Sequence, residues 1–244
     1  MMILFIQNLI YNLDGAYKWG GITSDWNHIH YDYYEFNGQY MPPIVHGMRV
    51  VHDIKRLLSA QLLNRCEDYL VYERFLRPIS YNEPYKIERE QRGGNEYYSV
   101  VDKDAHVCIQ FCIMAENISA LPDREEEVGI PVSDMIESYR EYSDIYAGDP
   151  FWLFCDTYLL KVMMRHDFVS DILKNKNIFI AKASQYYSGF SPASQVESIK
   201  NVSFNVDIEE IKVQEQESII NLMVGITTNI GKIESSNIFI VRDR

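Results

Sequence analysis

Val202-Ser203-Phe204-Asn205-Val206 alternates apolar and polar side chains, which is the pattern of a β-strand with one buried face. Further along, apolar runs at 219–227 and 238–241 lie on either side of Gly231, and the three segments together predict a closing β meander. Earlier in the chain, strands are predicted at 2–6, 45–51, 70–76, 107–115 and 178–181. A hairpin is predicted where 85–89 and 97–101 flank Gly93-Gly94-Asn95, because glycine and asparagine adopt the positive φ angles of tight turns.

Helices are fewer than strands in the predicted pattern. The clearest one can be capped by Asp53 or Ser59, and its apolar stripe consists of Ile54, Leu57, Leu58, Leu62 and Leu63. A second helix is predicted at 167–174 and a short one near 132–142. Residues 11–42 and 184–195 are expected to be irregular because glycine, serine and aromatic side chains are mixed there without a period.

Few helices and many strands predict an α+β fold. We expect a β-rich mixed or antiparallel sheet with two or three helices and a C-terminal β meander. The chain would consist of an α+β core at 1–195 and a β-rich tail at 196–244, in the same domain or in a separate one. No internal sequence repeat is visible.

The chain has 244 residues, and 35 acidic against 23 basic side chains give it a net charge of −12. This charge excludes nucleic acid and anionic membranes as partners, since both are negatively charged. No apolar stretch approaches the ~18 residues of a membrane span, and the apolar start at 1–6 lacks the basic flank of an export signal. We therefore expect a soluble cytoplasmic protein whose four cysteines are free thiols.

Catalytic motifs are nearly absent from the sequence. There is no glycine-rich phosphate loop, no paired-histidine metalloprotease helix and no complete nucleophile elbow. The best candidate is the stretch 25–32, where His28 and His30 would point to one side of a strand and could hold a metal. Asp25 or Asp32 could serve as a third ligand. The alternative is two surface histidines in an aromatic loop, and we expect no catalytic residue, metal or other cofactor.

An acidic segment stands out between Glu116 and Asp149. It holds ten acidic side chains and only two arginines, Arg124 and Arg140, together with three tyrosines. Such a segment is either a solvated face or a docking surface for a basic partner, in which tyrosines combine apolar area with a hydroxyl group. The predicted docking residues are Asp123, Glu125, Glu126, Glu127, Asp134, Glu137, Tyr139, Glu141, Tyr142, Asp144 and Tyr146.

The order of elements resembles that of immunity proteins from bacterial polymorphic toxin and contact-dependent inhibition systems. The resemblance covers about 45–183 and rests on the capped helix at 53–59, the tyrosine-rich strand at Glu96-Tyr97-Tyr98, and the helix at 168–173 followed by Ile178-Phe179-Ile180. It implies a binding protein without enzymatic activity that covers the active site or substrate groove of a cognate toxin. A basic nuclease is one such toxin, because its phosphate groove would attract an acidic inhibitor.

Two alternatives to a toxin inhibitor stay open at this point. One is a metal-dependent enzyme built around His28 and His30. The other is a structural or accessory protein that assembles with itself, its β tail adding strands to a partner.

Overall fold

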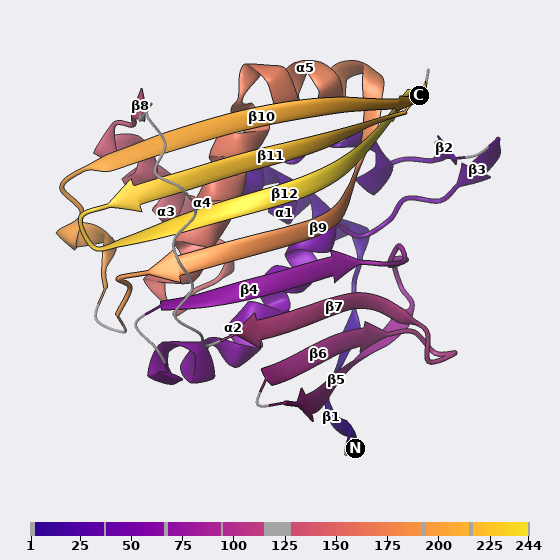
Figure 1. Ribbon diagram of the computed structural model, residues 1–244, viewed down its shortest axis with the longest axis horizontal. Coiled ribbons are helices and arrows are strands. Elements are labelled where there is room, and N and C mark those ends of the chain that lie inside the picture. Colours follow the sequence, from indigo (N-terminus) through magenta and orange to yellow (C-terminus); the bar gives the residue numbers. More distant parts are fainter. Residues whose placement is uncertain are drawn as a thin grey trace.

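A computed structural model describes residues 3–36, 38–65, 68–93, 95–114, 128–191, 194–214 and 217–243. Its main feature is a ten-stranded sheet with helices α1 to α4 packed on one face (Figure 1). The helices are α1 (Leu13–Thr23), α2 (Gly47–Arg65), α3 (Val132–Ile145), α4 (Phe151–Arg165) and α5 (Asp167–Asn175). Two 3-10 turns, η1 (His28–His30) and η2 (Val196–Ser198), complete the described helical segments.

The strands of the large sheet pair antiparallel throughout the described residues. They are β1 (Ile3–Ile10), β4 (Asp68–Phe75), β5 (Pro84–Arg92), β6 (Asn95–Val101), β7 (Val107–Met114), β8 (Val128–Gly129), β9 (Lys176–Ser188), β10 (Val202–Gln214), β11 (Glu217–Thr228) and β12 (Gly231–Asp243). A small separate hairpin joins β2 (Tyr34–Phe36) and β3 (Gln39–Met41). The predicted α+β class with an antiparallel sheet is confirmed, but the described residues form five α-helices and not two or three.

The sheet is built from two halves with the same topology. Its order is β1-β5-β6-β7-β4-β9-β12-β11-β10-β8. In each half, the strand that follows the helices in the chain, β4 or β9, lies at the middle of the sheet. The β4–β9 pair joins the halves, and α2 and α4 pack behind it, each preceded by a shorter helix, α1 or α3 (Figure 1). The topology therefore repeats although the sequence shows no repeat.

A buried polar network connects the two halves behind the central strands. The Lys55 ammonium group on α2 lies 2.9 Å from an Asp156 oxygen on α4 and 3.0 Å from a Glu73 oxygen on β4. Gln185 on β9 contacts both Lys55 and Asp156. Because Lys55 is fully buried, it needs these carboxylates, and removing one partner would leave an uncompensated charge in the core.

Several predicted elements differ from those in the structure. Thirteen of the fifteen residues of α4 are buried, including the polar Asp156, Thr157 and Lys161, so its sequence does not divide into an apolar and a polar face. The predicted strand at 45–51 contains the start of α2, and α1 lies within the segment 11–42 that was expected to be irregular. β9 continues to Ser188, inside the predicted loop at 184–195.

The C-terminal meander is present as β10, β11 and β12, which pair in sequence and lie in the same sheet as β9. The predicted division at residue 195 stays a prediction. The hairpin of β5 and β6 is also present, and Gly93 in its turn has a φ of 54°. Among the described residues, no helix is both long and apolar enough to cross a membrane.

Candidate functional site

A cavity of about 280 Å³ lies between the connection from α1 to α2 and the sheet, where both halves line it, the first through Phe75 and Ile109 and the second through Ile178 and Phe239. Most of its lining is apolar, and the polar side chains Asp25, Asn27 and His30 stand together in its wall. Its deep residues Leu160, Met164, Ile178 and Phe239 are all buried, whereas Leu76 and Arg77 at the rim are exposed. Apolar pockets with a few convergent polar groups are the usual form of small-molecule sites.

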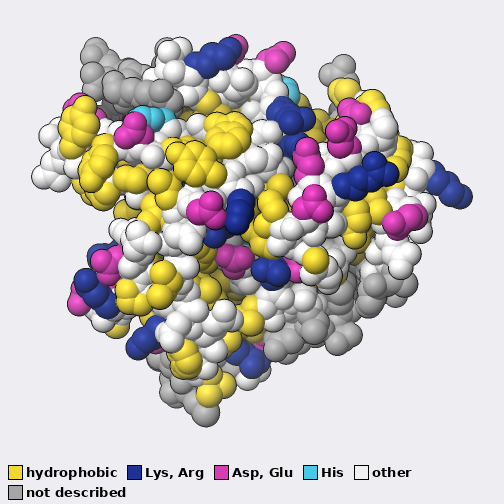
Figure 2. Space-filling view, turned by 180° about the vertical axis from the view of Figure 1, so that it is seen from behind, with side chains coloured by type: hydrophobic (Ala, Val, Ile, Leu, Met, Phe, Trp, Pro, Cys, Tyr) yellow, Lys and Arg dark blue, Asp and Glu magenta, His cyan; other side chains and the backbone are white. Residues whose placement is uncertain are grey.

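The rim adjoins the small β2–β3 hairpin, which contributes Tyr34, Phe36 and Met41 to the lining. Seen from the helical side, hydrophobic side chains gather on the part of the molecule that carries this hairpin (Figure 2). Tyr33 and Tyr40 are among the large hydrophobic side chains that the structure leaves exposed there. The hairpin side of the mouth is therefore apolar and aromatic, whereas Arg77 adds a positive charge at the rim.

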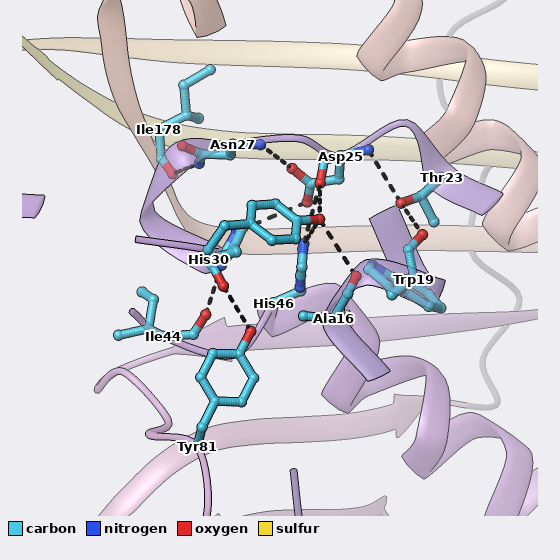
Figure 3. Close-up of polar contacts among 11 residues, drawn as sticks. Ala16, Trp19, Thr23, Asp25, Asn27, His30, Ile44, His46, Tyr81 and Ile178 are labelled. Carbon is cyan, nitrogen blue, oxygen red and sulfur yellow. Dashed lines mark hydrogen bonds and ion pairs between the residues drawn. The ribbon is translucent and has the colours of Figure 1, made fainter. Parts of the chain in front are cut away.

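Asp25 is fixed by the way in which α1 ends. Ser24, the residue after the helix, has a left-handed φ of 59° and turns the chain sharply. The Thr23 hydroxyl then accepts a hydrogen bond from the Asp25 amide at 3.3 Å, and the Asp25 side chain accepts one from the Asn27 amide at 3.3 Å. The Asn27 side chain donates to the carbonyl of Ile178 at 2.6 Å and so ties this loop to β9 of the other half (Figure 3).

His30 faces Asp25 across the same loop. Its Nδ1 lies 2.9 Å from the carbonyl oxygen of Ile44, and because a carbonyl only accepts, Nδ1 carries the proton in the neutral ring. The free Nε2 is 3.9 Å from Oδ2 of Asp25 (Figure 3). The Tyr81 hydroxyl donates a hydrogen bond to the backbone carbonyl of His30 at 3.0 Å and so helps to fix the turn η1.

Burial moves the two titrating groups toward their neutral forms. Desolvation raises the pKa of the Asp25 carboxyl group, although the nearby His30 and the Asn27 amide oppose this shift. Desolvation lowers the pKa of His30, although Asp25 opposes that shift. Burial therefore makes the Asp25 carboxyl group a weaker acid and the His30 ring a weaker base than in water, which brings the pKa values of the two groups closer together.

His46 completes the polar cluster and stacks on His30, with ring centroids 3.8 Å apart and planes inclined by 25°. Its Nε2 lies 3.2 Å from both the Asp25 carbonyl and the Tyr31 hydroxyl, and burial lowers its pKa well below the ordinary value. Donor atoms of Asp25, His30 and His46 lie within 4.8 Å of one another, a spacing open to a metal ion. Nearly parallel rings do not direct their in-plane lone pairs to one point, so the cluster fits proton transfer better than metal binding.

The N-terminus of α2 also faces the cavity through Gly47 and Met48. The first amide groups of a helix have no partner within the helix, and the helix dipole makes this end attractive to negative charge. A Cβ atom on Gly47 would lie 2.6 Å from the Phe75 ring, so only glycine lets that ring pack against the helix start. The start of α2 therefore lies in the wall of the same cavity as the Asp25–His30 pair.

An irregularity in the sheet shapes the cavity wall that β9 and β12 form. The register of β9 and β12 shifts between Ile238 and Phe239, and Ala181 is the extra residue on β9. Such a bulge re-aims side chains and is frequent beside active sites. Four consecutive residues at this irregularity, Ile178, Phe179, Ile180 and Ala181, line the cavity.

The stretch 25–32 was the best catalytic candidate in the sequence, but its predicted geometry was wrong. Residues 28–30 form the 3-10 turn η1 and not a strand, so the two histidines do not share a face. His28 is only partly buried and its Nε2 contacts the Tyr33 carbonyl at 3.1 Å. The partners of His30 are Asp25 and His46. His46 could not be predicted from the sequence, because it follows the β2–β3 hairpin and lies outside the stretch 25–32.

The predicted docking residues lie far from this cavity in the chain. Asp123, Glu125, Glu126 and Glu127 fall outside the described residues. The exposed acids Asp134, Glu137, Glu141 and Asp144 lie on α3, followed by Tyr146.

The tyrosines of this segment do not form an exposed surface. Tyr142 is only 1% exposed, and its hydroxyl donates to Asp149 at 2.7 Å. Tyr139 and Tyr146 are half-buried, and Tyr139 packs against Phe154. Tyr142 also packs against Phe154 of α4, and Tyr146, the residue after α3, packs against His52 of α2, so these aromatic side chains face the core.

No family model and no curated protein matches the sequence. Solved structures do match the fold over nearly the whole chain. A protein of Chloroflexus aurantiacus described as a MaoC domain dehydratase has a TM-score of 0.57 at 7% identity, covering 100% of this chain and 95% of its own. A MaoC-like dehydratase has a TM-score of 0.52 at 9% identity, covering 99% and 98%. A Mycobacterium tuberculosis protein described as a double hotdog has a TM-score of 0.56 at 12% identity, covering 97% and 96%.

The chain has a double hotdog fold. The resemblance to immunity proteins was therefore wrong, because the matched structures are not of that class. The predicted role as a toxin inhibitor without enzymatic activity, with a basic toxin as partner, is contradicted with it, since the double hotdog is here shared with proteins described as dehydratases. The order of elements misled because a strand, a capped helix and a hairpin occur in many unrelated folds.

Proposed function

We propose that this chain is an enzyme that removes water from, or adds water to, an acyl chain beside an activated carbonyl group. The observation that carries the proposal is the buried Asp25–His30 pair, 3.9 Å apart, in the wall of an apolar cavity. The proteins described as dehydratases that share the fold support the same class of reaction. The substrate we propose is a 3-hydroxyacyl thioester, or its 2-enoyl counterpart in the reverse direction.

His30 acts as the base in dehydration. The bond from its Nδ1–H to the Ile44 carbonyl leaves the Nε2 lone pair free inside the cavity. This lone pair takes the proton from the carbon next to the substrate carbonyl, which a thioester makes acidic. Burial lowers the pKa of His30, so the ring is neutral and ready to accept a proton over a wider pH range.

The N-terminus of α2 stabilises the charge that develops on the substrate carbonyl oxygen. When the carbon loses its proton, negative charge moves to this oxygen, and the amide groups at Gly47 and Met48 stand in the cavity wall. Amide donors that are already in position are worth more in a dry site than in water, because they need no reorganisation.

Asp25 acts as the acid. Burial raises the pKa of its carboxyl group and favours the protonated form, which donates its proton to the leaving hydroxyl group. A carbon–hydrogen bond and a carbon–oxygen bond break, a carbon–carbon double bond forms, and water leaves. Transfer of the proton from the His30 ring to the Asp25 carboxylate restores both groups, and the same steps in reverse hydrate the double bond.

The experiment is to follow 2-enoyl thioesters of increasing chain length by the loss of their conjugated absorbance. His30→Asn keeps a donor for the Ile44 carbonyl but has no base, and it should lower turnover by about 10²–10⁴-fold. His28→Asn is the matched control, because His28 lies in the same turn outside the cavity lining, and it should keep wild-type activity. Equal activity of wild type and His30→Asn, or no turnover of any chain length by the wild type, contradicts the proposal.

A further inference from the structure

A second, smaller cavity of about 20 Å³ lies beneath α5. Every side chain that lines it is apolar: Met164, Phe168, Val169, Ile172, Ile178, Ile220, Leu222, Phe239 and Val241. These residues come from α4, α5 and the strands of the second half. The space therefore lies inside the second half, behind the wall of the main cavity.

Three of these residues also line the main cavity, namely Met164, Ile178 and Phe239. Each is buried, with 8%, 8% and 7% of its surface exposed. They form a partition one side chain thick between two apolar spaces. A ligand that grew past this partition would meet only apolar surface on the other side.

The partition lies where the loop that carries Asp25 and His30 meets the sheet. The carbonyl of Ile178 accepts the 2.6 Å hydrogen bond from Asn27, two residues after Asp25. Phe239 stands at the register shift between β9 and β12, opposite Ile180. Met164, near the end of α4, is an unbranched and adaptable side chain of the kind that fills irregular gaps.

We infer that Met164, Ile178 and Phe239 form the end stop of the acyl chain and set the longest substrate that the enzyme accepts. The chain passes the Asp25–His30 pair and ends against this partition, and the cavity beneath α5 is unused space behind it. This inference rests on the proposed function and specifies its substrate. Opening the partition would join the two cavities and admit a longer chain.

The test is the dependence of kcat/KM on chain length in partition variants. Phe239→Ala removes the largest side chain of the partition and should move the preferred chain length up by two or more methylene groups. Each additional buried methylene is worth about 0.8 kcal/mol, which corresponds to roughly a fourfold rise in kcat/KM for the chain that carries it. Because Phe239 also packs in the core, Phe239→Leu is the gentler second variant and should give a smaller shift in the same direction.

Two further variants separate an end stop from a general loosening of the core. Val241→Ala widens the second cavity without touching the main one, since Val241 lines only the former, and it should leave the length preference unchanged. Adding Val169→Phe to Phe239→Ala refills the second cavity from α5 and should restore the wild-type preference.

The outcomes distinguish this inference from the proposed function. If Phe239→Ala and Phe239→Leu both turn over short chains with the wild-type length preference, the end stop is refuted while the dehydratase proposal stands. If the wild type turns over no thioester, the proposed function fails, and ligand-induced rises in unfolding temperature with unreactive saturated acyl thioesters still decide the end stop. A rise that reaches longer chains in Phe239→Ala than in wild type supports it, and identical length limits overturn it.

Discussion

Asp25→Asn is the most incisive single change in the catalytic pair. The substitution keeps the size of the side chain and an oxygen that can accept the hydrogen bond from the Asn27 amide, so the turn after α1 should be retained. It removes the acidic proton that the proposed mechanism delivers to the leaving hydroxyl group. The loop, the cavity and the position of His30 should therefore stay the same while the chemistry fails.

Activity and stability should move in opposite directions in this variant. General acid catalysis contributes about 10²–10⁴-fold, so kcat should fall by that factor, or about 3–5 kcal/mol in the activation barrier. Burial raises the pKa of Asp25 in the folded chain above its ordinary value of 3.8. Folding therefore takes up protons, and this carboxyl group lowers stability as pH rises above 3.8. An amide does not titrate, so at neutral pH the variant should be as stable as wild type or more stable.

The assay pairs steady-state kinetics on a 2-enoyl thioester with urea unfolding at acidic and neutral pH. Asp32→Asn is the matched control, because Asp32 is exposed on the same loop and its side chain accepts a bond from the Tyr33 amide that asparagine can also accept. This control should match wild type in both measurements. An Asp25→Asn variant with wild-type kcat would refute the role of Asp25 as the acid. A variant that loses both activity and stability would show that the carboxyl group is structural.

Gly47→Ala should lower kcat/KM by tenfold or more, because the added Cβ would lie 2.6 Å from the Phe75 ring and displace the start of α2. Gly21→Ala is the control and should keep wild-type kinetics, because an added Cβ there would have no neighbouring atom within 4 Å. Lys55→Met should lower the free energy of unfolding by about 3–5 kcal/mol, because it leaves two buried carboxylates without their cation. Lys174→Met, which removes an exposed ion pair, should change it by less than about 1 kcal/mol in the same urea titration. The pH–rate profile of the wild type should stay flat as pH falls through 6.5 and decline only below it, because burial lowers the pKa of His30; a decline centred above 6.5 would contradict this assignment.

Local patterns in the sequence predicted the elements whose two faces differ. The alternation at 202–206 predicted β10, and glycine at position 93 predicted the β5–β6 turn, since both signals depend on neighbours a few residues apart. The stripe of isoleucine and leucine from Ile54 to Leu63 likewise predicted the central and C-terminal part of α2. Sequence reasoning missed α4 because a helix buried on all sides carries no polar stripe, and it missed α1 because aromatic and glycine residues obscured its period.

The candidate site was only partly accessible to sequence reasoning. The stretch 25–32 could be recognised as rich in groups for proton transfer or metal binding, and it does contain Asp25 and His30. Which histidine matters depends on η1, whose tight turn sends His30 inward and leaves His28 partly exposed. The net charge of the acidic run is visible in the sequence, whereas the burial of Tyr142 depends on tertiary packing.

By itself the sequence determined the charge of the chain, its α+β character and the meander at its end, because composition and short-range periodicity are properties of the chain alone. Only the tertiary structure decided that two halves, between which no sequence repeat is visible, share one topology across the β4–β9 pair. It also decided the site, because Ile178 and Phe239 are brought to the loop of Asp25 across more than 150 residues of chain. No local pattern records such a contact, since it exists only once the sheet has closed the two halves together.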